Sequence, residues 1–262
     1  MDTTLHALAT TAAPTALAVL GAAVLLWLVS LVRRDASITD PAWGPGFVLV
    51  AVVSTLAVET VGPRGWLALV LVSAWGLRLG WHLLRRNLAH GEDPRYVAMR
   101  AEHGASFVWV SLFTVFLLQG ALLWVVSLPL QVAATSTAPL GALDLLGTLV
   151  VLAGLAIESV ADAQLTRFRA DPASRGRVLD TGLWAWTRHP NYFGDAVVWW
   201  GFGAFALATG AWGALAGPVL MTVLLRRVSG VTLLEKDIVS RRPGYADYVA
   251  RVPPFFPRPP RR

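Results

Sequence analysis

The chain of 262 residues contains no cysteine and little charge. The lack of cysteine excludes disulfides, thiolate metal ligands and cysteine nucleophiles. Charged residues make up 15% of the chain and hydrophobic residues 55%, whereas soluble globular chains carry roughly 25% charge. Long uncharged runs accompany this deficit, and the mean hydropathy is +0.57. The composition therefore predicts an all-α fold, a polytopic helical bundle in a membrane.

Lysine is nearly absent as well. Lys236 is the single lysine among 22 basic residues, so arginine carries the positive charge behind a formal net charge of +6. Apart from Arg64 and Arg78, the arginines fall in four separate groups, at 33–34, 85–100, 167–188 and from 226 onward. This scatter argues against a nucleic-acid partner, which would need a contiguous basic face. The positive-inside rule instead predicts an N-terminus outside and a C-terminus in the cytoplasm, with Arg64 alone on the outer side.

The apolar runs set the number of expected membrane helices. A spanning helix needs about 20 apolar residues, and seven stretches qualify: 11–32, 43–61, 65–84, 106–128, 141–160, 195–209 and 212–228. The last two are short and closely joined, so six spans is the alternative. We expect one transmembrane domain over 1–262. The Met1-Asp2 start lacks a basic n-region, so we expect no cleaved signal peptide and a multi-pass protein of a bacterial inner (plasma) membrane.

Two familiar site patterns are absent or misplaced. The five histidines show neither H-E-x-x-H nor another paired ligand spacing, so we expect no metal site. Residues 201–206 fit G-x-G-x-x-A, but they lie inside an expected span rather than after a strand. These glycines are better explained by close helix packing.

The densest polar cluster is Thr-Arg-His-Pro-Asn-Tyr-Phe-Gly-Asp at 187–195, directly before an apolar segment. Unpartnered polar groups cost several kcal/mol each in lipid. The Pro190-Asn191 pair predicts a helix start, whose free N–H groups attract anions. Arg188 adds a forked donor for phosphate. The alternative is an interfacial turn in which the arginine snorkels to the headgroups.

Two more polar groups lie in the C-terminal half. Glu235 ends an apolar stretch and precedes Tyr245 and Tyr248, which are three apart and share a helix face. The alternative is a solvated tail with surface ion pairs. A second stripe recurs along one helix face at Glu158, Asp162, Thr166 and Arg169. Such a stripe on an apolar span faces a bundle interior or cavity, or else it forms ion pairs that end the span.

The N-terminal half carries an acid at the start of the second expected span. Asp40 at this depth requires a cation or a hydrogen-bond donor. Arg78, His82 and Arg86 lie four apart on one face of the third span, with Tyr96 further on. Arg78 or His82 could serve as the partner. The alternative is a purely structural Asp–Arg pair that fixes the helix arrangement.

Together these motifs resemble a known family. Gly182-Leu183-Trp184, the 187–195 cluster, Leu234-Glu235-Lys236 and Arg-Arg-Pro-Gly-Tyr-Ala-Asp-Tyr at 241–248 are similar to segments of the bacterial steroid 5-alpha-reductase-like membrane proteins. The resemblance extends through 91–96 and 161–164. The wider group includes the sterol C14-reductases and the isoprenylcysteine carboxyl methyltransferases.

The resemblance implies an NADPH pocket made by the C-terminal helices and cytoplasmic loops. It implies that cofactor contacts come from Arg188, His189, Asn191, Tyr192 and Asp195, and that Asp162, Arg169, Glu235, Tyr245 and Tyr248 close the pocket. In 5-alpha-reductases an acid on the second span and a tyrosine on the next polarise an enone. Asp40 is the best match for the acid. The tyrosine has no clean counterpart: His82 lies near its expected position, and Tyr96 is the nearest tyrosine.

Three functions remain open from the sequence. The first is an NADPH-dependent reductase of a polarised C=C bond in a lipid-soluble, steroid-like substrate, with 1–105 on the substrate side and 106–262 on the cofactor side. The many arginines suit the 2′-phosphate of NADP. The second is an S-adenosylmethionine-dependent methyltransferase acting on a lipid or lipidated substrate. The third is a non-enzymatic lipid-binding or scaffold protein. The partners expected are a lipid-soluble small molecule and membrane lipids.

Overall fold

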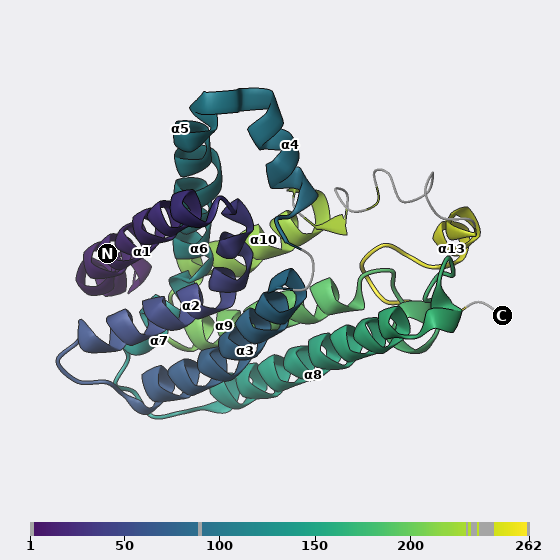
Figure 1. The fold of residues 1–262 in the computed structure, drawn as a ribbon. Helices are drawn as coiled ribbons and strands as arrows, with labels where there is room; N and C mark the ends of the chain where they lie inside the picture. Colours follow the sequence, from purple (N-terminus) through teal and green to yellow (C-terminus); the bar gives the residue numbers. More distant parts are fainter. Residues whose placement is uncertain (1–2, 89–90, 229, 232–234, 236–243, 261–262) are drawn as a thin grey trace. The chain divides into compact units, whose positions relative to one another are not determined.

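A computed structural model describes residues 3–88, 91–228, 230–231, 235 and 244–260 (Figure 1). All regular elements in these ranges are helical, which confirms the all-α prediction. The described part divides into two compact units. Unit 1 comprises 1–144 and 205–217, and unit 2 comprises 145–204 and 218–262. The expected functional division near residue 105 stays a prediction.

Among the described residues, five helices are long and apolar enough to cross a membrane, so the protein is an integral membrane protein. They are Thr4–Arg33, Ala36–Leu56, Pro63–Leu88, Pro94–Val126 and Ala142–Ala170. The count of seven is not confirmed. The last two expected spans correspond to α9 (Pro190–Ala208), whose first turns are polar, and α10 (Ala216–Val223), which is too short. The orientation of the termini also stays a prediction.

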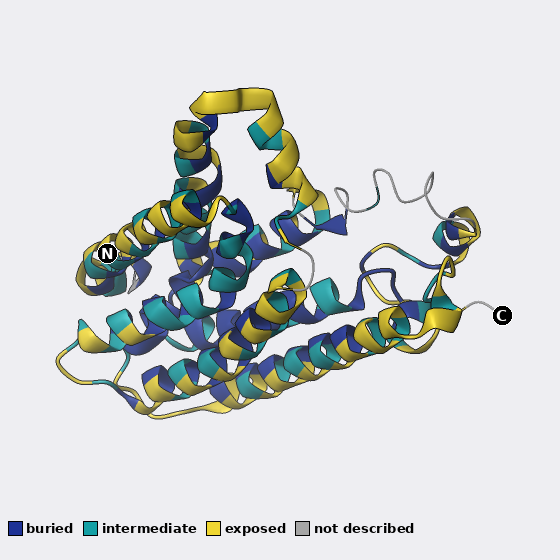
Figure 2. Ribbon diagram, viewed as in Figure 1, coloured by how far each residue is buried: buried dark blue, intermediate teal, exposed yellow. Residues whose placement is uncertain are grey.

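The exposed surface of the long helices is apolar. In Figure 2 exposed residues line one side of α8 (Ala142–Ala170), and Leu145, Leu149 and Leu152 are among them. Exposed leucines occur on α1 (Thr3–Arg33) as well, where Leu17 and Leu25 are each more than 60% exposed. Water would make such surfaces aggregate, whereas lipid tails are as apolar as leucine and cover them at no cost.

Unit 1 is built around the close pair α2 (Thr39–Leu56) and α3 (Pro63–Leu88), which lie side by side in Figure 1. Gly44 and Gly76 face each other, and a Cβ at either would overlap the carbonyl oxygen of the other. Small residues at such a contact allow two membrane helices to approach closely. Glycine is therefore required on both sides of this interface.

The fourth long segment of unit 1 is interrupted twice. It runs through α4 (Pro94–His103), α5 (Phe107–Ser111), the π-helical η3 (Leu112–Leu117) and α6 (Leu118–Val126), followed by α7 (Leu128–Ala134). Gly104 has a φ of 54°, and here α4 meets the following helix at the sharp bend seen in Figure 1. Asp93 caps α4 by accepting the Arg95 N–H at 2.9 Å. Burial alone would raise the pKa of Asp93, but the hydrogen bonds from Arg95 outweigh it and lower the pKa.

Arg64, the exception to the charge pattern, is buried and neutralised. Its Nε and Nη2 donate to the two carboxylate oxygens of Asp144 at 2.6 and 2.9 Å, and both side chains are almost fully buried. Ser136 and the carbonyl of Pro139 accept further bonds from the same guanidinium. This forked pair ties the start of α3 to the first turn of α8.

Unit 2 contains most of α8 and α9, the short η5 (Gly182–Ala185) and α13 (Tyr245–Arg251). The two long helices touch through glycines, because a Cβ at Gly154 would lie 2.7 Å from the Gly194 carbonyl oxygen. A Cβ at Gly201 would lie 2.6 Å from Val151. Close packing is thus confirmed as the role of Gly201, the first glycine of the G-x-G-x-x-A match.

Candidate functional site

The first polar network lies in unit 2 and centres on Glu235. Arg188 donates to both its carboxylate oxygens, from Nε at 2.6 Å and from Nη2 at 2.7 Å. The third guanidinium nitrogen donates to the carbonyls of Val249 and Val252 at 3.2 and 2.6 Å. All three nitrogens of this buried arginine are therefore engaged by the protein. Arg188 fastens the start of α9 to the segment that contains α13.

Further donors converge on the same carboxylate. His189 Nε2 lies 3.0 Å from Glu235 Oε1, and the Tyr245 hydroxyl lies 3.5 Å from that oxygen. Burial alone would raise the pKa of Glu235, but hydrogen bonds from His189 and Arg188 outweigh it and lower the pKa to about 2. The His189 ring also stacks on Tyr192, with centroids 5.6 Å apart. Three of the predicted cofactor residues thus meet around the carboxylate of a fourth, Glu235, and Tyr192 adjoins them.

Asn191 and Asp162 form a second contact in this unit. Asn191 Nδ2 donates to Asp162 Oδ1 at 3.2 Å. Because a carboxylate only accepts, this bond fixes which end of the amide faces Asp162. Asn191 Oδ1 then points elsewhere, and it is buried without a hydrogen-bond partner among the described residues. A buried acceptor left in this way fits a ligand that brings an N–H or O–H donor.

The other predicted cofactor residues have distinct surroundings. Asp195 is buried, four residues beyond Asn191 on α9. Arg169 is exposed near the end of α8, two helical turns beyond Asp162. The Tyr248 hydroxyl donates to the Trp184 carbonyl at 2.6 Å, and burial raises the pKa of Tyr248. Tyr248 therefore anchors α13 through its hydroxyl, and its contact with a cofactor stays a prediction.

The second polar network lies in unit 1 and joins residues far apart in sequence. The Tyr96 hydroxyl donates to Asp40 Oδ1 at 3.1 Å. Arg95 approaches the other carboxylate oxygen at 3.4 Å, and Arg86 lies 3.9 Å from it. The structure thus brings together two predicted catalytic residues and places Arg95 and Arg86 beside the acid. A contact of Asp40 with Arg78 or His82 stays a prediction. His82 is half-buried on α3, and its catalytic role stays a prediction.

This network continues through a residue that the sequence reasoning missed. Gln119 Nε2 donates to the Tyr96 oxygen at 3.4 Å, and Thr39 donates to Gln119 Oε1 at 3.3 Å. The direction is fixed by the carboxylate, since Asp40 takes the phenolic proton and leaves the Tyr96 oxygen as an acceptor. The amide of Gln119 must then turn its NH₂ group toward Tyr96. A lone glutamine in the apolar run 106–128 was the available signal.

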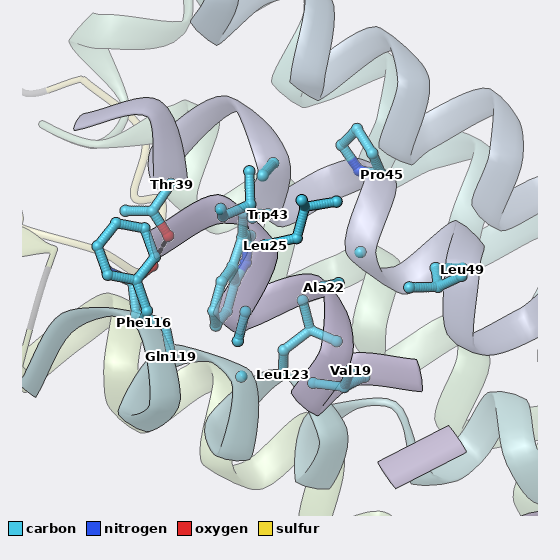
Figure 3. A pocket seen from close by; sticks show the side chains of 15 residues that line it. Val19, Ala22, Leu25, Thr39, Trp43, Pro45, Leu49, Phe116, Gln119 and Leu123 are labelled. Atoms are coloured by element: carbon cyan, nitrogen blue, oxygen red, sulfur yellow. Dashed lines mark hydrogen bonds between the residues drawn. The ribbon is translucent and has the colours of Figure 1, made fainter. Parts of the chain in front are cut away.

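The network ends at an apolar cavity within unit 1. The cavity has a volume of about 290 Å³ and is lined by residues of α1, α2, η3 and α6. Figure 3 shows Leu25 and Trp43 on its wall, with Thr39 and Gln119 joined by their hydrogen bond at one end. Small-molecule sites are typically apolar with a few placed polar groups, and this cavity has that form.

These features define a helical integral membrane protein with a polar network beside an apolar cavity. The chain belongs to the DUF1295 family, described as a protein family of unknown function, whose model matches residues 26–252. This family is steroid 5-alpha-reductase-like, and the expected resemblance is confirmed at that level.

The curated relatives are less informative about function. An uncharacterized protein of Schizosaccharomyces pombe is 25% identical over 89% of this chain and 76% of its own length. A protein of Pseudomonas savastanoi pv. phaseolicola, described as a probable 4-amino-4-deoxy-L-arabinose-phosphoundecaprenol flippase subunit, is 38% identical over 66 residues, which are 25% of this chain and 58% of that protein. No solved structure matches the chain.

Proposed function

We propose that this protein is a membrane-embedded, NADPH-dependent reductase of a polarised C=C bond in a lipid-soluble substrate. The observation that carries the proposal is the Asp40–Tyr96–Gln119 network at the end of an apolar cavity. Membership of a steroid 5-alpha-reductase-like family supports the same reaction class. The cavity suits an apolar substrate body, and the network suits its single polar end.

The proposed chemistry explains why such a network is needed. NADPH, when bound, would supply the hydride that adds to the β-carbon of the enone, and a proton from water would complete the reduction at the α-carbon. Negative charge then develops on the carbonyl oxygen, and preoriented donors stabilise it strongly where water is excluded. Asp40 holds the Tyr96 hydroxyl in place, while Arg95 and Arg86 balance the charge of Asp40. The carboxylate side chain is 15% exposed, so it can exchange protons with solvent.

Unit 2 supplies the residues that fit the cofactor. Asn191 Oδ1 is a buried acceptor that suits an amide, amine or ribose hydroxyl donor. Arg169 is exposed and suits a phosphate, including the 2′-phosphate that separates NADP from NAD. For Arg188 we propose a positioning role, because its three nitrogens already hold Glu235 and two backbone carbonyls.

Thermal unfolding of the purified chain tests the cofactor, because a ligand that binds the native state alone raises stability. At 100 times its Kd, NADPH should contribute about 2.7 kcal/mol, and NADH and S-adenosylmethionine should contribute far less. Asn191→Leu should remove the stabilisation by NADPH. Arg169→Gln should reduce the difference between the stabilisation by NADPH and the stabilisation by NADH.

Thr222→Val provides the matched control. It also removes a polar group from unit 2, one that accepts a hydrogen bond from Trp200 at an exposed position, and should leave the NADPH effect intact. Stabilisation by S-adenosylmethionine alone would indicate the methyltransferase instead. If neither NADPH nor S-adenosylmethionine raises the unfolding temperature, the cofactor proposal is wrong.

A further inference from the structure

Gln119 is one of two described residues of the unit 1 network that reach the cavity. Of the described residues in the unit 1 network, Gln119 and Thr39 line the cavity, and Tyr96 and Asp40 stand behind them. A neutral amide is also much less costly at membrane depth than a charged side chain. The side chain that meets an apolar ligand is therefore not the acid or the tyrosine.

The hydrogen-bond direction determines what the cavity offers. The Nε2 group of glutamine carries two N–H donors, and the described residues engage one of them, through Tyr96. Gln119 Oε1 is occupied by the Thr39 hydroxyl. The amide is held in one orientation from both ends, and its second N–H can donate a hydrogen bond to a ligand. A group that accepts a hydrogen bond is the complement of this end of the cavity.

We propose that Gln119 contacts the substrate, donating its second N–H to the carbonyl oxygen of a lipid that has an apolar body and one oxygen at its polar end. Tyr96 and Asp40 act through it as positioning residues, because they fix the direction of its amide. The identification of the oxygen as the reacting carbonyl rests on the proposed reductase function. The preference of the cavity for an acceptor does not depend on the cofactor.

Equilibrium binding without cofactor tests this assignment. The full chain in lipid nanodiscs would be titrated with radiolabelled androst-4-en-3-one and with androst-4-ene, which lacks the oxygen. One lost hydrogen bond corresponds to about a tenfold change in Kd, so the wild type should bind the ketone about tenfold more tightly. Gln119→Met preserves the length of the side chain without its donors, and it should abolish this preference while leaving binding of the hydrocarbon unchanged.

Leu123→Ala is the matched control, since Leu123 lines the same cavity one helical turn further on and is apolar. It should weaken both probes equally and keep their ratio. Thr39→Val is a second test that leaves Gln119 in place. It removes the donor that holds the amide, and it should reduce the ketone preference by a few-fold.

The outcomes separate this inference from the proposed function. A ketone preference that survives Gln119→Met but is lost in Tyr96→Phe would assign the contact to Tyr96 and overturn the inference. Binding of neither probe by the wild type would overturn it as well. A preference that depends on Gln119 without any NADPH-dependent reduction would uphold the inference and refute the reductase. NADPH-dependent reduction that is insensitive to Gln119→Met would uphold the reductase and refute the inference.

Discussion

The two polar networks differ in what their hydrogen bonds lead to. In unit 2, the Glu235 carboxylate accepts hydrogen bonds from Arg188 and Tyr245 and contacts His189 Nε2. The remaining nitrogen of Arg188 donates to backbone carbonyls. We call it the closed network, because all three nitrogens of Arg188 bond to other described residues of unit 2. In unit 1, the chain of bonds from Asp40 runs through Tyr96 to Gln119 at a cavity, and it is open at that end.

The difference shows that a dense polar motif and a ligand contact are separate things. The cluster at 187–195 is the most polar stretch of its region, but much of it holds the protein together. The open network is assembled from single residues at positions 39, 40, 96 and 119. We therefore expect damage to the closed network to reduce stability first, and damage to the open one to reduce binding and turnover first.

Glu235→Gln should have the largest effect on stability. It removes the negative charge and leaves Arg188, whose side chain is 7% exposed, facing a neutral partner. Breaking one side of a buried ion pair costs roughly 3–5 kcal/mol, measurable as the free energy of unfolding in detergent. Asp180→Asn is the control, because its pair with Arg251 is exposed and should contribute about 0–1 kcal/mol. Equal losses in the two variants would mean that unit 2 holds no closed network.

The same carboxylate should make stability depend on acid pH. Glu235 has a pKa of about 2 in the folded chain against an ordinary 4.5. A pKa lowered by folding contributes stability that is complete above the unfolded value and is lost as the pH falls through the folded one. The unfolding temperature of the wild type should thus fall from about pH 4.5 toward pH 2. Glu235→Gln should lack this component, and parallel curves for the two proteins would contradict the assignment.

Tyr96→Phe should have the smallest effect on stability and a large one on activity. It removes one hydroxyl that bonds to Asp40 and Gln119, which corresponds to about 1 kcal/mol of folding free energy. Loss of the oriented donor chain should lower NADPH-dependent turnover by roughly 10²-fold. A variant that is as unstable as Glu235→Gln, or as active as the wild type, would erase the distinction between the two networks.

Much of this organisation was predictable from the sequence. Low charge and long apolar runs predicted an all-helical membrane protein, and motif resemblance pointed to Asp40 and Tyr96, which the structure brings into contact. The partners of the arginines were not predictable, because sequence shows donors without showing what they meet. Arg188 finds Glu235 47 residues away. Gln119 was missed because one glutamine in an apolar run has no motif around it.

The number of spans was harder to predict for a related reason. Windows of apolar residues register composition, but they do not show where a helix begins and ends. The α9 helix starts at Pro190, so its first turns hold the polar residues Asn191, Tyr192 and Asp195 of the 187–195 cluster. The α10 helix ends in a π-helical segment, η7 (Leu224–Val228), after two turns. Both features follow from local backbone geometry, which depends on packing that the sequence does not display.

The buried pair of Arg64 and Asp144 also has a consequence for how the protein is made. The two residues are 80 positions apart, and ribosomes add roughly 5–20 residues per second. The arginine is therefore synthesised about 4–16 s before its carboxylate partner exists. The Arg64 charge therefore lacks its Asp144 partner while the first three helices are being synthesised, and the buried pair can form only once the start of α8 exists.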